Sequence, residues 1–120
     1  MKKFLIPAII LALSLPSLNL HSQETILSKE RIVRIAMDAF QKAGGNLKER
    51  IVIYDVGNGR WEKTFGTLEQ ELISRFEVLL AQDYQAVCFA LKPKPNLKGK
   101  NVWVFVDTAT KEVLALYVED

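Results

Sequence analysis

Three carboxylates lie in or beside predicted strands and are the side chains suited to acid–base chemistry: Asp55, Glu62 and Asp107. A close pair of carboxyl groups can divide into a general acid and a general base when their environments differ. However, Asp107 precedes Thr-Ala-Thr, and Asp55 lies one residue before a Gly-Asn-Gly turn. An aspartate at the start of a turn usually bonds its own backbone. We therefore expect turn-forming roles for both aspartates, with a carboxylate active site as the lesser alternative.

The side chains that most often act as nucleophiles or metal ligands are scarce. The sequence has one cysteine, Cys88, and one histidine, His21. Cys88 stands between Val87 and Phe89, which is the setting of a small buried hydrophobic residue. A single cysteine also excludes zinc sites built from paired cysteines. We expect a buried Cys88 without a catalytic role, with an intermolecular disulfide or a nucleophilic thiol as the lesser alternatives, and we expect no metal site and no cofactor.

Four lysines within nine residues form the main candidate binding segment: Lys92, Lys94, Lys98 and Lys100. No acidic residue lies among them, two prolines stiffen the segment, and a glycine lets it turn. A solvated hairpin loop is one interpretation. A preorganised contact for an acidic protein surface or an anionic envelope component is the other. Residues 92–100 are called the lysine loop.

Trp61 and Trp103 are large apolar side chains whose indole N–H groups require hydrogen-bond partners. Both suit a protein core. An exposed tryptophan would instead be a strong contact residue. Trp103 lies close to the lysine loop in the sequence. We therefore add it to the four lysines as a fifth candidate binding residue.

The first 22 residues have the layout of a secretory signal peptide. Lys2 and Lys3 precede an apolar run from Phe4 to Leu15, and the small Ser22 lies at the predicted cleavage site. The apolar run is too short to span about 30 Å of hydrocarbon. We expect export to the periplasm or secretion, no stable membrane anchor after cleavage, and one domain over residues 23–120.

The charge count changes when the predicted signal peptide is removed. The 120-residue sequence has 16 basic and 14 acidic residues. The signal segment contains Lys2, Lys3 and His21 but no acidic residue, so the mature chain would have 14 of each and no histidine. Nucleic-acid binders normally carry a strong basic excess, so we expect no nucleic-acid partner. Without histidine the chain lacks the usual general base near neutral pH, which favours a non-enzymatic role.

The remaining pattern predicts elements that would position these residues. Apolar residues at three- and four-residue spacing predict one helix over Ile32 to Ala43 and a second from Thr67 to Leu80. Two runs around Gly-Asn-Gly, Ile51 to Val56 and Arg60 to Phe65, predict a β-hairpin. Three more strands are predicted at the C-terminal end: Tyr84 to Leu91, Val102 to Asp107 and Val113 to Val118.

This order predicts an α+β fold in which two helices pack on a curved, mostly antiparallel sheet of about five strands, in the order α-β-β-α-β-β-β. The last two strands are apolar on both faces. Two helices would cover only one face, so the sheet must either curl around a pocket or meet a partner. A second copy of the chain, forming a homodimer through the sheet, is one such partner.

Three segments carry a family resemblance: the helix from Ile32 to Ala43, the Trp61-containing hairpin, and the closing NVWVFVDTATKEVLAL from Asn101 to Leu116. In this element order the chain resembles small exported domains of the cystatin-like and nuclear-transport-factor-two-like kind. The closing segment also resembles the strand-turn-strand end of PepSY-type domains. These resemblances imply a curved sheet that encloses a cone, and a role as an inhibitor, an immunity protein or a ligand binder.

We expect a small exported non-enzymatic binding protein, of the inhibitor or immunity type, that contacts an acidic protein partner through the lysine loop and the neighbouring sheet. The alternative is a ligand carrier or sensor with an apolar cavity in the curved sheet, lined by aromatic residues such as Phe89, Trp103 and Tyr117. A carboxylate enzyme is the third hypothesis, and it requires two of the three candidate carboxylates to share a cleft.

Overall fold

The computed structural model describes the backbone of residues 15–119 and the side chains of residues 27–119. The chain divides into two compact units, residues 1–31 and 32–120. The predicted signal peptide covers residues 1–22, of which residues 1–14 lie outside the described part, and it stays a prediction. Among the described residues, no helix combines the length and apolarity needed to cross a bilayer.

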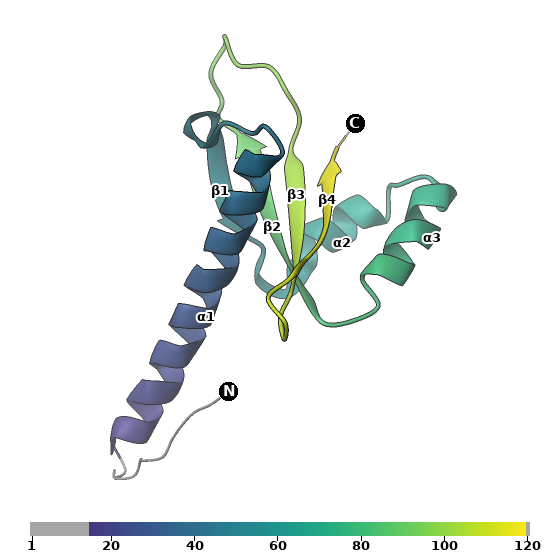
Figure 1. The fold of residues 1–120 in the computed structure, drawn as a ribbon. Helices are drawn as coiled ribbons and strands as arrows, with labels where there is room; N and C mark the ends of the chain where they lie inside the picture. Colours follow the sequence, from purple (N-terminus) through teal and green to yellow (C-terminus); the bar gives the residue numbers. More distant parts are fainter. Residues whose placement is uncertain (1–14, 120) are drawn as a thin grey trace. The chain divides into compact units, whose positions relative to one another are not determined.

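The described part is an α+β fold, as the sequence predicted (Figure 1). Its four strands pair in sequence order, β1-β2-β3-β4, and each neighbouring pair is antiparallel. The described part has four strands where the sequence predicted about five. The elements are α1 (Leu15–Lys42), η2 (Leu47–Glu49), β1 (Arg50–Tyr54), η3 (Val56–Asn58), α2 (Gly59–Phe65), α3 (Gln70–Leu79), β2 (Tyr84–Leu91), β3 (Val102–Asp107) and β4 (Val113–Val118).

The missing strand is the second arm of the predicted hairpin, which is helix α2. Trp61 and Phe65 share one face of this helix, with ring centroids 5.9 Å apart. The buried carboxylate of Asp55 accepts hydrogen bonds from the backbone N–H groups of Arg60 (3.2 Å) and Trp61 (2.8 Å). An acidic acceptor at free N–H groups in the first turn stabilises a helix. The observed order is therefore α-β-α-α-β-β-β rather than α-β-β-α-β-β-β.

Asn58 joins the start of α2 to the sheet. Its backbone is left-handed, with φ of 58°. Its side chain donates to the Tyr84 carbonyl oxygen (2.9 Å) and accepts from the Ala86 backbone N–H (2.8 Å). These bonds extend the β1–β2 ladder beyond its last paired residues, so the turn is held by polar contacts to β2 and not by a second strand.

Both faces of the central strands are covered by the chain's own helices. On one face, Ile32, Ala36 and Phe40 of α1 pack against alternate residues of β2 and β3, and the Phe40 and Phe89 rings stack 4.4 Å apart. On the other face, Trp61 of α2 and Phe76 of α3 pack against Trp103 and other side chains of β2 and β3. This arrangement removes the reason to expect an uncovered face on β3, the first of the two strands that are apolar on both faces.

The edge strand β4 differs from the two central strands. Three of its apolar residues remain exposed: Val113, Leu116 and Val118. The other edge strand, β1, exposes Ile51. A homodimer through the sheet stays a prediction.

Candidate functional site

The lysine loop connects β2 to β3 and extends past the ends of both strands (Figure 1). Lys94, Lys98 and Lys100 are exposed and Lys92 is half-buried. The two ion pairs in the described part of the chain, Lys42–Asp38 and Arg75–Glu71, involve none of these four lysines. Their positive charges therefore face solvent without an acidic partner among the described residues.

Both stems of the lysine loop are anchored to the β1 side of the sheet. The Lys92 backbone N–H donates to the Glu49 carbonyl oxygen (2.9 Å) at the first stem. At the second stem, Arg50 Nη1 donates to the carbonyl oxygens of Lys100 (2.5 Å) and Phe89 (3.2 Å). A backbone bond from Leu97 to Lys94 (3.1 Å) closes a turn within the loop. The loop is thus held at its ends and in its middle.

Close packing and a cation–π contact hold the Arg50 guanidinium in place. It lies over the Phe40 ring, with 5.5 Å from Cζ to the ring centroid. Gly99 lies next to the Arg50 guanidinium, because a Cβ atom there would be in van der Waals contact with Nη2, at 3.4 Å.

Trp103 is buried (2% exposed), so it is not the exposed contact residue that the binding hypothesis required. Its indole N–H donates to Glu119 Oε1 (2.5 Å). The side chain lines a cavity of about 300 Å³ that also contains Arg60, Lys63 and Asn101. Asn101 directly follows Lys100, so this cavity extends from the end of the lysine loop to Arg60 and Lys63 of α2.

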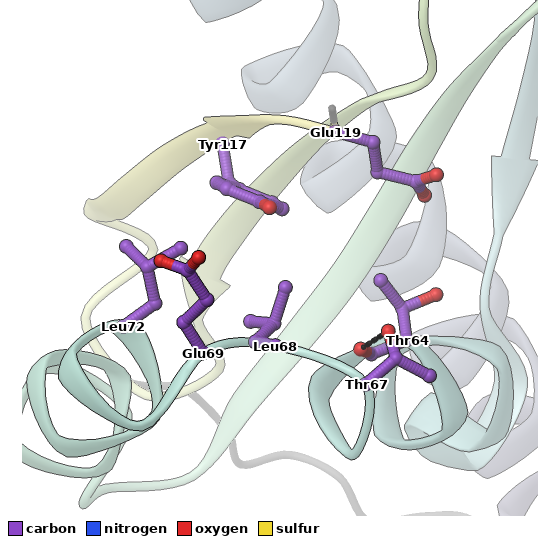
Figure 2. Close-up of a pocket in the computed structure, with 7 residues that line it drawn as sticks. All are labelled: Thr64, Thr67, Leu68, Glu69, Leu72, Tyr117 and Glu119. Carbon is purple, nitrogen blue, oxygen red and sulfur yellow. Dashed lines mark hydrogen bonds between the residues drawn. The ribbon is translucent and has the colours of Figure 1, made fainter.

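A second cavity, of about 210 Å³, lies between β4 and the segment that joins α2 to α3 (Figure 2). It shares Thr64 and Glu119 with the first cavity. The Thr67 hydroxyl donates to the Thr64 carbonyl oxygen (2.7 Å), and Glu119 accepts from Trp103. The Thr67 hydroxyl and the Glu119 carboxylate are thus engaged in the fold, and Glu69 is the second carboxylate that lines this cavity.

Cys88 is buried on the α2 side of the sheet. Burial, with a smaller contribution from the Glu119 charge, raises the pKa of its thiol from 9.0 to about 11. The thiolate is the nucleophilic and metal-binding form of cysteine. The thiol is therefore held in its unreactive form.

Among the residues that the structure describes, the three candidate carboxylates are used separately. Asp55 binds the start of α2, while Glu62 lies exposed on that helix. Asp107 accepts from the backbone N–H groups of Ala109 (2.8 Å) and Thr110 (3.0 Å), which forms the expected aspartate turn. None of the three cavities described in this structure is lined by two of these carboxylates.

The cavity expected inside the curved sheet is not formed by the residues named for it. Phe89 packs against α1, whereas Trp103 and Tyr117 pack on the α2 and α3 side. Adjacent residues of one strand point to opposite faces, and Phe89 follows Cys88, the register partner of Trp103. Phe89 and Trp103 therefore cannot line one pocket.

The sequence analysis did not identify two residues of these sites, Arg50 and Glu119. Arg50 lies 50 residues before Lys100, and no local pattern links a strand-opening arginine to a distant loop. Glu119 lies two residues after Tyr117, which pairs with Trp103 in the β3–β4 register. Because side chains alternate between the two faces of a strand, Glu119 is expected on the same face as Tyr117 and Trp103. This hydrogen-bond partner could therefore have been predicted from the sequence.

The described residues contain no group of three or more histidine, cysteine, aspartate or glutamate side chains able to hold a metal ion. Comparisons with family models, with curated proteins and with solved structures found no match to this chain. The cystatin-like, nuclear-transport-factor-two-like and PepSY-type resemblances therefore stay predictions.

Proposed function

We propose that this chain is an exported, non-enzymatic binding domain that contacts an acidic surface of a partner protein through the lysine loop. The observation that carries this proposal is the anchoring of the loop. Both stems are hydrogen bonded to Glu49 and Arg50, and none of the four lysines forms an ion pair with a described residue. A positive surface without internal partners can attract and orient an acidic one.

Anchoring matters because ordering a flexible loop on binding costs free energy. Arg50 and Glu49 hold the stems before any partner arrives, and two prolines restrict the backbone between them. Arg60 and Lys63 of α2 line the cavity that begins at Asn101, where Glu119 is the one acidic lining residue. The proposed contact surface is therefore the lysine loop together with this end of α2.

A non-enzymatic role is supported by how the reactive groups are used. Cys88 is buried with a raised pKa, and the carboxylates of Asp55 and Asp107 accept backbone hydrogen bonds. These groups serve the fold. Export is supported by the signal-peptide pattern of residues 1–22. N-terminal sequencing of the protein recovered from its producing cells should begin near Gln23, and an intact Met1 would contradict export by this route.

The binding proposal is tested with polyglutamate, a defined probe for an acidic protein surface. The test variant replaces all four loop lysines with glutamine. Its control carries the same charge change on α1, with glutamine in place of four exposed cations: Lys29, Arg31, Arg34 and Lys42. Circular dichroism checks that each variant is folded.

We expect the loop variant to weaken polyglutamate binding about tenfold or more, and the α1 variant to change it less than about threefold. Equal weakening by the two variants would show that the probe responds to net charge alone, and it would overturn the proposal. The proposal would also be overturned if neither variant nor the unmodified chain bound polyglutamate at low salt.

A further inference from the structure

We propose that the cavity between α2 and α3 binds a small alkylammonium ligand, with its apolar part against aromatic side chains and its positive charge beside Glu62 and Glu77. This cavity lies apart from the lysine loop and shares no lining residue with the other two cavities. The inference is independent of the proposed function.

The cavity has a volume of about 300 Å³ and opens between α2, α3 and the start of β2. This volume lies at the lower end of the range for ligand sites, so it suits a small molecule. Four aromatic side chains line it: Trp61, Phe65, Phe76 and Tyr84. Trp61 and Phe76 are almost fully buried (1% and 5% exposed), whereas Phe65 and Tyr84 are half-buried and so reach the opening.

The aromatic side chains favour a cation over a neutral ligand of the same shape. The faces of tryptophan, tyrosine and phenylalanine rings carry negative electrostatic potential that attracts ammonium groups. Trp61 lies at the centre of this group, 5.9 Å from Phe65 and 5.2 Å from Phe76 between ring centroids. Its position is fixed by these contacts, so the rings are preorganised for a ligand.

The acidic residues of the cavity point to the same ligand class. Glu62 and Glu77 are exposed, and neither forms an ion pair with a described residue. No basic side chain lines the cavity. An anionic ligand would meet two like charges here, while an organic cation would gain both the apolar contact and the attraction of the carboxylates.

Tyr84 lies within reach of the negative charge of Glu62. Burial raises the pKa of its hydroxyl, and the negative charge of Glu62 raises it further. The Glu62 charge therefore acts on the Tyr84 side of the cavity. A bound cation would lie in this field.

The test compares choline with 3,3-dimethylbutan-1-ol, a neutral molecule of nearly the same shape. Titration calorimetry on the full chain measures both affinities at low salt, and amide NMR shifts locate the binding. The test variant carries Glu62→Gln and Glu77→Gln. The control carries Glu69→Gln and Glu71→Gln, which remove the same charge at and near the start of α3 outside this cavity.

We expect choline to bind about tenfold more tightly than the neutral alcohol, with shifts among residues 61–84. The Glu62/Glu77 variant should lose this preference, and the Glu69/Glu71 variant should keep it. Equal affinity for the two ligands, or no binding of choline up to about 10 mM, would overturn the inference. A preference that survives in the Glu62/Glu77 variant would overturn the role of the carboxylates.

Discussion

The guanidinium of Arg50 donates a hydrogen bond to the carbonyl oxygen of Lys100 across 50 positions of sequence, at 2.5 Å. The same nitrogen also donates to the Phe89 carbonyl oxygen. One side chain from the edge strand β1 thus ties the end of the lysine loop to the neighbouring strand β2. The four lysines of this loop lie on a segment whose ends are fixed by the sheet.

Arg50→Lys should loosen the lysine loop while keeping the positive charge. A lysine ammonium lacks the planar guanidinium that reaches two carbonyl oxygens and lies over the Phe40 ring. We expect unfolding free energy to fall by about 1–2 kcal/mol and the Lys92 amide to exchange faster with solvent deuterium. Urea unfolding and hydrogen exchange measure the two effects.

Arg75→Lys is the matched control for this prediction. Arg75 is exposed and pairs with Glu71 at 3.7 Å, so its replacement should leave stability nearly unchanged. Equal effects of the two substitutions would contradict the anchoring role of Arg50.

Asp55→Ala should destabilise the start of α2. The Asp55 carboxylate is buried (4% exposed) and accepts the backbone N–H groups of Arg60 and Trp61. Removing an acceptor from such N–H groups costs about 1–2 kcal/mol in unfolding free energy. Asp55→Asn keeps one oxygen and should cost less. Asp83→Ala, at an exposed aspartate, serves as the control in urea unfolding, and an equal loss there would argue against the capping role.

Cys88 should resist thiol reagents in the folded protein. The rise of its pKa from 9.0 to about 11 lowers the thiolate fraction about a hundredfold at mildly alkaline pH, and burial adds a steric barrier. We expect labelling with a disulfide reagent to become fast only in urea. Rapid labelling of the folded chain would show an accessible thiol and reopen a chemical role for Cys88.

Asp107 should contribute to stability at neutral pH and lose that contribution in acid. Backbone hydrogen bonds from Thr110 and Ala109 lower the pKa of its carboxyl below the ordinary 3.8. The ionised form is therefore favoured by folding, and its contribution is present above 3.8 and disappears as pH falls through the lower folded pKa. Asp107→Asn should destabilise the chain at neutral pH and not in strong acid, as measured by urea unfolding at both pH values.

The opposite pH pattern for Asp107→Asn, with a larger loss in acid, would contradict these hydrogen bonds. An NMR titration of the carboxyl checks the direction of the pKa shift without any substitution.

The sequence predicted the α+β class and the last three strands because long runs of β-branched and aromatic residues leave little ambiguity. The end of α1 was also predicted, to within one residue: the expected helix ended at Ala43, and α1 ends at Lys42, two residues before Gly44, whose φ is 98°. Helix α2 was mistaken for a strand because Trp61 and Phe65 are four residues apart. That spacing places both on one face of a strand and also on one face of a helix.

Lys63 was the local signal that distinguished the two alternatives for this segment. In a strand it would share the buried face with Trp61 and Phe65, whereas in α2 it is exposed. The contact of Arg50 with the lysine loop depends on the folded arrangement. Sequence periodicity carries no information about this contact, because Arg50 and Lys100 are 50 positions apart and belong to different elements.

Site-directed photo-crosslinking in the producing cells tests the central claim most directly. A photoreactive amino acid replaces Asn96 in the lysine loop or, as a control, Gln82, which is exposed between α3 and β2. The proposal predicts a discrete protein adduct from position 96 that is absent from position 82 and is lost when the four loop lysines become glutamine. An adduct that survives the loss of the lysines, equal adducts at both positions, or none at either would contradict it.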